Sequence, residues 1–132
     1  MAAIFRHRTD SLEAGAMKVQ AKLLEREYAS KLERDYSLVL KAQQQAATIA
    51  WWAYEPLSFR IGAGASYCPD FVVLTASGEL EAHECKGFRR EAAIVRIKVA
   101  ARMAPWCRFV LVTRGNLRIE GKRAWQIEEI KP

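Results

Sequence analysis

Hydrophobic residues recur at helical spacing through the first third of the chain. The repeating positions are Leu12, Met17, Val19, Leu23, Leu24, Tyr28, Leu32, Tyr36, Val39 and Leu40. A period near 3.6 residues predicts a helical region over residues 11–50, preceded by a flexible basic arm of residues 1–10. One helix of about 40 residues is unusual for a globular domain, so we expect a break near Gly15 or at Ser30, which can cap a second helix.

The pattern then changes from helical to alternating. Residues 51–54, Trp-Trp-Ala-Tyr, form an aromatic group at the expected helix end, and we predict that they pack in the core rather than stack on nucleobases. Residues 55–61 alternate Leu57, Phe59 and Ile61 with other side chains and predict the first strand. The Gly-rich residues 62–66 predict a flexible loop that a substrate approaches.

A β-hairpin is predicted over residues 67–88, because two strand-like runs flank the turn signal Ala-Ser-Gly. The arms of a hairpin run antiparallel, so Asp70 at the start of one arm should lie beside the end of the other. Glu84 and Lys86 stand at that end and, two residues apart, share one face of their strand. The pattern therefore gathers two carboxylates and an amine at one end of a sheet.

The remaining pattern predicts one helix and three strands. A helix is expected over residues 92–104, a buried strand over 106–113, and a terminal hairpin over 116–128 that turns at Gly121. The apolar stripe of the helix comprises Ile94, Ile97 and either Val95 or Ala101. Helices mixed with strands indicate an α/β or α+β protein.

Length and composition narrow the function classes. With 132 residues, 51% of them apolar and 27% charged, the chain matches one ordinary globular domain. It has neither an apolar run long enough to span a membrane nor the apolar core of a signal peptide, so we expect a cytoplasmic protein without a membrane partner. Three cysteines without a Cys-x-x-Cys motif favour reduced thiols over disulfides or zinc. A net charge of +6 favours a polyanionic partner, although a mildly basic protein without such a partner is the alternative.

The predicted group of Asp70, Glu84 and Lys86 suits metal-assisted chemistry. Two neighbouring carboxylates repel each other unless a cation lies between them. Oxygen ligands suit Mg²⁺, and a nearby lysine can orient a water molecule or neutralise a developing negative charge. The alternative is a solvated salt bridge on the surface of a metal-free interaction protein.

The spacing of these residues resembles a known family. Pro69-Asp70, then 13 residues, then Glu84-Cys85-Lys86 is similar to the signature of the PD-(D/E)XK nuclease superfamily, and the resemblance covers about residues 27–113. It implies a restriction-endonuclease-like α-β-β-β-α-β core over residues 56–113, with a mixed sheet flanked by helices. It also implies a Mg²⁺-dependent endonuclease of phage or prophage type that hydrolyses DNA phosphodiesters, accepts Mn²⁺ as a substitute, and acts in the host cytoplasm.

The resemblance also assigns roles to residues. It implies that Asp70, Glu84 and the carbonyl of Cys85 bind the metal, and that Lys86 positions or deprotonates the attacking water. Ser30-Lys31-Leu32-Glu33 is similar to a Ser-Lys-x-Glu stretch of small phage endonucleases. That similarity makes Glu33 the fourth catalytic residue, with Glu27 as the second candidate.

Basic residues follow the Glu-Cys-Lys tripeptide in a pattern that again resembles the phage group. The proposed phosphate contacts are Arg89, Arg90, Arg96, Lys98 and Arg102. A solvated helix face is an equally simple reading of these residues. The phage group is often likened to Holliday-junction resolvases, so branched DNA is a candidate substrate and a homodimer is left open. The alternative function is a non-catalytic nucleic-acid-binding module that retains the nuclease fold.

Overall fold

Ser30 starts helix α2 (Lys31–Gln45) in a computed structural model, which describes residues 27–88 and 91–132 of the chain. The N–H of Glu33 donates to Ser30 Oγ (3.2 Å), and the Ser30 hydroxyl donates to Glu33 Oε2 (2.8 Å). A serine in this position satisfies a backbone donor that the first helical turn leaves unpaired. The prediction that Ser30 caps a second helix is confirmed, whereas the basic arm and the break at Gly15 lie outside the described residues.

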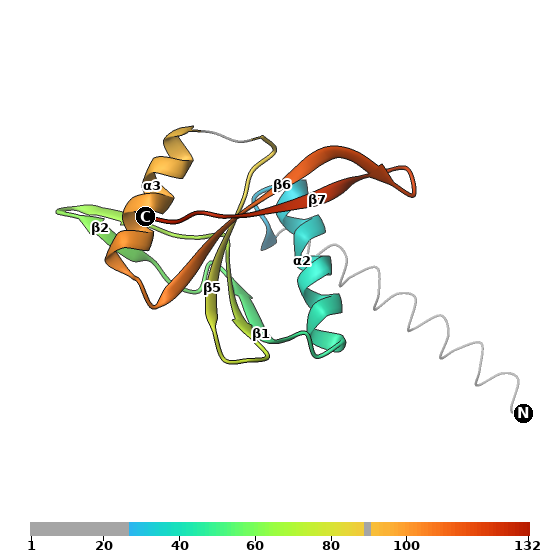
Figure 1. The fold of residues 1–132 in the computed structure, drawn as a ribbon, viewed down its shortest axis with the longest axis horizontal. Coiled ribbons are helices and arrows are strands. Elements are labelled where there is room, and N and C mark those ends of the chain that lie inside the picture. Colours follow the sequence, from blue (N-terminus) through green and yellow to red (C-terminus); the bar gives the residue numbers. More distant parts are fainter. Residues whose placement is uncertain (1–26, 89–90) are drawn as a thin grey trace, which may run out of the picture. The chain divides into compact units, whose positions relative to one another are not determined.

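The chain divides into two compact units, residues 1–35 and 36–132. The second unit contains every strand of the described residues, helix α3 and the part of α2 from Tyr36 onward (Figure 1). Among the described residues, no helix is long and apolar enough to cross a membrane.

The predicted helical region ends too late. Helix α2 stops at Gln45, a turn with Ala47 at a φ of 60° follows, and strand β1 (Ile49–Tyr54) begins. Aromatic and β-branched side chains favour a strand, and they dominate this stretch. The prediction of helix up to residue 50 is therefore wrong. So is the placing of the aromatic group at a helix end.

A five-stranded mixed sheet with the order β1-β4-β5-β6-β7 forms the framework of the second unit. After β1, its strands are β4 (Phe71–Thr75), β5 (Leu80–Cys85), β6 (Cys107–Ile119) and β7 (Lys122–Glu129). Strands β5 and β6 are parallel and are joined through helix α3 (Glu91–Met103), whereas the other neighbours are antiparallel. The α/β class and the mixed sheet are confirmed.

Residues predicted as the first strand of this sheet form a separate hairpin instead. Strand β2 (Phe59–Gly62) pairs with β3 (Ala65–Tyr67) in a sheet of two strands. Gly64, with a φ of 71°, allows the tight turn between them, so the expected flexible loop is mostly strand. In the main sheet, the first strand is β1 and not the strand predicted at residues 55–61.

Helix α3 covers one face of the main sheet. Its side chains Ile94, Ile97 and Ala101 are buried in a cluster with Phe109 of β6 and other residues. Ala101 is 5% exposed and Val95 is 59% exposed, so Ala101 completes the apolar stripe.

Aromatic rings occupy the opposite face. The Tyr36 ring of α2 packs edge-on against Phe71 with centroids 5.6 Å apart, and Trp52 and Tyr54 of β1 lie 5.9 and 5.3 Å from the same ring. Trp51, one residue before Trp52, points to the other face of the sheet and is 43% exposed. The prediction that the aromatic group packs in the core therefore holds for only part of the group.

Strands β6 and β7 form a hairpin longer than the predicted one. Their pairing runs from Val110 opposite Glu129 to Ile119 opposite Lys122. The turn residues, Glu120 and Gly121, have φ values of 51° and 78°, as in the turns that favour tight hairpins. The turn at Gly121 is confirmed.

Candidate functional site

The register of the β4–β5 hairpin places Asp70 beside Glu84. Phe71 pairs with His83, so one step further along both strands sets Asp70 opposite Glu84. The main-chain N–H of Cys85 donates to Asp70 Oδ2 at 2.8 Å, which fixes this carboxylate against the end of β5. The structure thus brings the two predicted carboxylates to one end of the sheet.

Glu84 has two polar partners. Lys86 Nζ lies 3.1 Å from Glu84 Oε1, and the Tyr67 hydroxyl donates to Glu84 Oε2 at 3.0 Å. Glu84 is only 8% exposed, and a polar group so far removed from water is costly to bury without such hydrogen-bonding partners. Lys86 keeps more contact with solvent, because 30% of its side chain is exposed.

Sequence reasoning missed Tyr67. It comes from the small β2–β3 sheet and is 5% exposed. Burial, followed by the negative charges of Glu84 and Asp70, raises the pKa of Tyr67 well above its usual range, while the Arg96 guanidinium opposes the shift. Tyr67 therefore keeps its proton and acts as a hydrogen-bond donor to Glu84. No local sequence pattern predicts the hydrogen bond between Tyr67 and Glu84, because the two residues belong to separate sheets.

The pair lies at the end of the sheet face that α3 covers. Glu84 is opposite Leu111 of β6, and two residues earlier Ala82 is opposite Phe109. Ala82, Phe109 and Leu111 all belong to the core cluster beneath α3. The site is thus continuous with the hydrophobic core on one side.

The predicted basic residues are only partly brought together. Arg96, Lys98 and Arg102 are all exposed on α3. At 100° per residue, Lys98 and Arg102 share one side of the helix, and Arg96 lies on another. Arg96 is the one whose charge acts on Tyr67. Arg89 and Arg90 lie outside the described residues.

Glu33 belongs to the first unit, in the first turn of α2, where Ser30 is its hydrogen-bond partner. Its role as a fourth site residue stays a prediction. The second candidate, Glu27, is exposed.

The donor set fits a hard divalent cation. In the described parts of the chain, no group of three or more His, Cys, Asp or Glu side chains is arranged to hold a metal ion. The set implied by the sequence is of another kind, two carboxylates and the Cys85 carbonyl. All three are oxygen donors, and Mg²⁺ commonly takes one or two carboxylates and keeps several waters. The Lys86 ammonium group at 3.1 Å from Glu84 already places one positive charge beside the pair.

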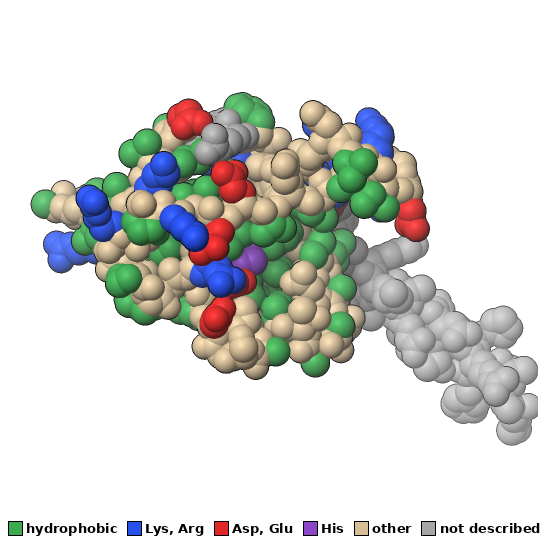
Figure 2. All heavy atoms as spheres, viewed as in Figure 1, with side chains coloured by type: hydrophobic (Ala, Val, Ile, Leu, Met, Phe, Trp, Pro, Cys, Tyr) green, Lys and Arg blue, Asp and Glu red, His purple; other side chains and the backbone are tan. Residues whose placement is uncertain are grey.

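A cavity of about 570 Å³ lies at the other end of β5. Its lining includes Leu80 and Trp106, and Leu80 starts the strand that Glu84 nearly ends, so the carboxylate pair does not line it. Arg108, also in the lining, lies within 4 Å of three carboxylates, those of Glu79, Glu81 and Glu129. Figure 2 shows acidic and basic side chains intermixed over this part of the sheet. The charge of Arg108 is therefore compensated by neighbouring carboxylates.

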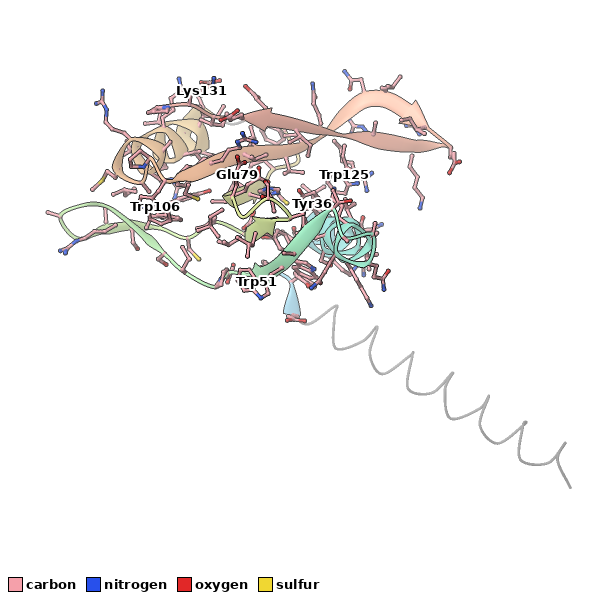
Figure 3. The ribbon with its side chains drawn as sticks, turned by 60° about the horizontal axis from the view of Figure 1, so that its bottom comes forward. Tyr36, Trp51, Glu79, Trp106, Trp125 and Lys131 are labelled. Atoms are coloured by element: carbon pink, nitrogen blue, oxygen red, sulfur yellow. The ribbon has the colours of Figure 1, made fainter. Side chains whose placement is uncertain are left out.

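Sequence reasoning also missed a buried series of hydrogen bonds on the face of the main sheet that carries Tyr36, called here the α2 face. The Tyr36 hydroxyl lies 2.6 Å from His83 Nδ1, and His83 Nε2 lies 3.1 Å from Glu81 Oε1. A carboxylate only accepts hydrogen bonds, so Nε2–H of His83 donates to Glu81, and in that tautomer Nδ1 accepts from the Tyr36 hydroxyl. Burial raises the pKa of Tyr36 above its usual range, which keeps this hydroxyl protonated. The hydrogen bond from His83 lowers the pKa of Glu81. Trp125 packs on Tyr36 with ring centroids 5.2 Å apart (Figure 3), and both Tyr36 and His83 are buried.

No protein-family model, no curated protein and no solved structure matches this chain. What the fold defines is an α/β protein whose mixed sheet carries two carboxylates and a lysine at one end of a hairpin.

Proposed function

We propose that this protein is a Mg²⁺-dependent endonuclease that hydrolyses DNA phosphodiester bonds. One observation carries the proposal. Asp70, Glu84 and Lys86, spaced as in the PD-(D/E)XK signature, meet at the end of the β4–β5 hairpin, with Lys86 in contact with Glu84.

The order of elements in the main sheet supports the same conclusion. Along the chain, the elements α2, β1, β4, β5, α3 and β6 give α-β-β-β-α-β when the separate β2–β3 hairpin is set aside. This is the order that the resemblance implies, with β1 in place of the strand expected at residues 55–61.

Each side chain of the candidate site has a separate role in the proposed reaction. Asp70, Glu84 and the Cys85 carbonyl would hold Mg²⁺, which when bound supplies a Lewis acid and lowers the pKa of a water ligand. Lys86, with three N–H donors, orients the attacking water and stabilises negative charge as it develops on the phosphate. Tyr67 fixes the Glu84 carboxylate through its 3.0 Å hydrogen bond, which limits the orientations that Glu84 can take.

The net charge of +6 supports DNA as the polyanionic partner. A branched substrate, Mn²⁺ as a substitute ion and a homodimeric state are further parts of the proposal that follow from the resemblance alone.

The test is a cleavage assay on duplex, nicked, flap and four-way-junction DNA with Mg²⁺, Mn²⁺, Ca²⁺ or excess chelator. We expect cleavage with Mg²⁺ and Mn²⁺, binding with little turnover in Ca²⁺, and no cleavage in chelator.

Glu84→Gln should abolish cleavage and retain DNA binding. Glu79→Gln is a matched control, because the Glu79 side chain is 59% exposed in the β4–β5 turn. Equal cleavage in chelator would overturn the metal mechanism. Binding without cleavage under every condition would favour the non-catalytic module.

A further inference from the structure

The outer part of the β6–β7 hairpin leaves the main sheet. The pairing of β6 with β5 ends at Val112, yet β6 goes on to pair with β7 as far as Ile119, with an irregularity in the register between Arg114 and Arg118. Residues 113–126 thus form a two-stranded ribbon that extends away from the sheet (Figure 1). At about 3.3 Å per residue, the ribbon is about 20 Å long.

The ribbon is strongly basic. Its basic residues are Arg114, Arg118, Lys122 and Arg123, and its one acidic residue is Glu120. Arg118 is opposite Arg123, and Arg114 is opposite Trp125. Arg123 and Trp125 are two residues apart and share a face, so all three arginines lie on the same face of the ribbon.

Three of these basic side chains keep their charge uncompensated by the described part of the chain. Arg118, Lys122 and Arg123 form no ion pair with a described carboxylate. The Arg118 guanidinium donates to the Gly121 carbonyl (3.4 Å) and that of Arg123 to the Gly115 carbonyl (3.2 Å). Two like charges directly opposite each other destabilise a strand pair. An anion placed between the two guanidinium groups would remove that cost.

The ribbon also starts at the candidate site. Val112, the last β6 residue paired with β5, lies opposite Cys85, and its carbonyl accepts a hydrogen bond from the Lys86 N–H at 3.0 Å. The ribbon thus begins at the end of β5 that carries Glu84, and its arginine face continues the α2 face, since Trp125 packs on Tyr36, whereas Glu84 lies on the α3 face.

We propose that this ribbon is a second DNA-contact surface, which enters a groove of the duplex and holds the phosphates on either side with Arg118 and Arg123. The major groove of B-form DNA admits a two-stranded β-ribbon, and arginine suits phosphate through its fork of donors. A length of about 20 Å spans about six base pairs at 3.4 Å each. Leu117 and Ile119, which are 69% and 60% exposed at the tip, supply apolar contacts of the kind made with thymine methyl groups.

DNA fits this surface better than a second copy of the chain. Exposed apolar residues at the tip could pair with each other, but two ribbons that each carry a net charge of +3 from residues 113–126 would repel. The inference rests on the proposed function in one respect, that the DNA bound here is also the substrate.

Binding in chelator tests the ribbon separately from cleavage. Fluorescence anisotropy with a duplex of about 25 base pairs, over a range of salt concentrations, compares the Arg118→Gln/Arg123→Gln variant with wild type. Two lost phosphate contacts should lower the log–log salt slope by about two and weaken binding roughly 10- to 100-fold near 0.1 M salt. The control Lys41→Gln/Lys131→Gln removes two exposed positive charges elsewhere and should change the slope little. Arg118→Lys/Arg123→Lys should restore the slope, which rules out misfolding as the cause.

The outcomes separate the two proposals. An unchanged slope in the Gln variant overturns the ribbon inference whether or not the protein cuts DNA. A ribbon-dependent slope in a protein that never cuts DNA overturns the nuclease and leaves the ribbon standing. Equal affinity for duplex RNA of the same length overturns groove entry, because the major groove of A-form RNA is too deep and narrow for a ribbon. A dimer in sedimentation that Leu117→Ser/Ile119→Ser dissociates, with DNA binding unaffected by the Gln variant, would assign the surface to a second copy instead.

Discussion

Tyr36→Phe offers the sharpest test of the packing on the α2 face. Tyr36 is 2% exposed, its hydroxyl lies 2.6 Å from His83 Nδ1, and its ring packs against Phe71 and Trp125. Phenylalanine keeps the ring and its edge-on contacts. The change therefore removes only the hydroxyl and leaves a buried ring nitrogen of His83 without its partner.

The expected loss follows from that geometry. A neutral hydrogen bond contributes about 1 kcal/mol, and leaving a buried acceptor unpaired costs about 1–3 kcal/mol. We therefore expect the free energy of unfolding to fall by about 1–3 kcal/mol. For a chain of this size each kcal/mol lowers Tm by roughly 4 °C, so Tm should drop by roughly 4–12 °C.

Urea and thermal unfolding of Tyr36→Phe, His83→Phe and the double variant measure this loss as a cycle. If the hydrogen bond is the cause, Tyr36→Phe costs much less in the His83→Phe background, because no acceptor is left unpaired. A Tm within 1 °C of wild type, or equal costs in both backgrounds, would refute the reasoning. At temperatures where the variant is folded, its DNA cleavage should match wild type, since Tyr36 lies on the face away from Glu84.

Three further predictions concern the site and the thiols. Lys86→Ala should slow single-turnover cleavage by roughly 10²-fold or more while metal affinity in calorimetry stays intact or rises; a large loss of metal affinity would instead make Lys86 part of the metal site. Glu33→Gln should weaken metal affinity, with cleavage partly recovered by excess metal, and Glu27→Gln should be mild; the reverse order would move the helix carboxylate to Glu27. Cys68 is exposed and should react with a thiol reagent at pH 8 within the mixing time of a hand assay, whereas burial raises the pKa of Cys107 to about 11, so rapid labelling of Cys107 in the folded protein would contradict its placement.

Local patterns predicted the elements whose partners are close in sequence. The β4–β5 hairpin follows from two strand-like runs around a glycine turn, and its register then sets Asp70 beside Glu84 without further information. Helix α3 follows from its period, and only the choice between Val95 and Ala101 needed the structure. Ser30 as a cap was equally local.

The sequence-based predictions failed where a strand or side chain pairs with a residue that is distant in the sequence. The stretch at residues 49–54 follows directly on a helical pattern, and periodicity alone does not locate the boundary between the two. Whether strand β2 joins the main sheet depends on which strand it pairs with, and its own alternation carries no such information. The hydrogen bonds of Tyr67 to Glu84 and of Tyr36 to His83 each join elements far apart in the chain, so no spacing rule finds them.

Strand β5 links the stability of the fold to the candidate chemistry. His83 and Glu84 are consecutive, so the pleat sends them to opposite faces. Tyr36 fixes His83 on the α2 face, while Tyr67 and Lys86 fix Glu84 on the α3 face. A slip of one residue would exchange the two faces, leaving Glu84 against the aromatic rings and the imidazole beneath α3. Each buried polar contact therefore excludes the register that would destroy the other. The Tyr36–His83 contact thus stabilises the register of β5, while the Glu84 carboxylate itself is oriented by Tyr67 and Lys86.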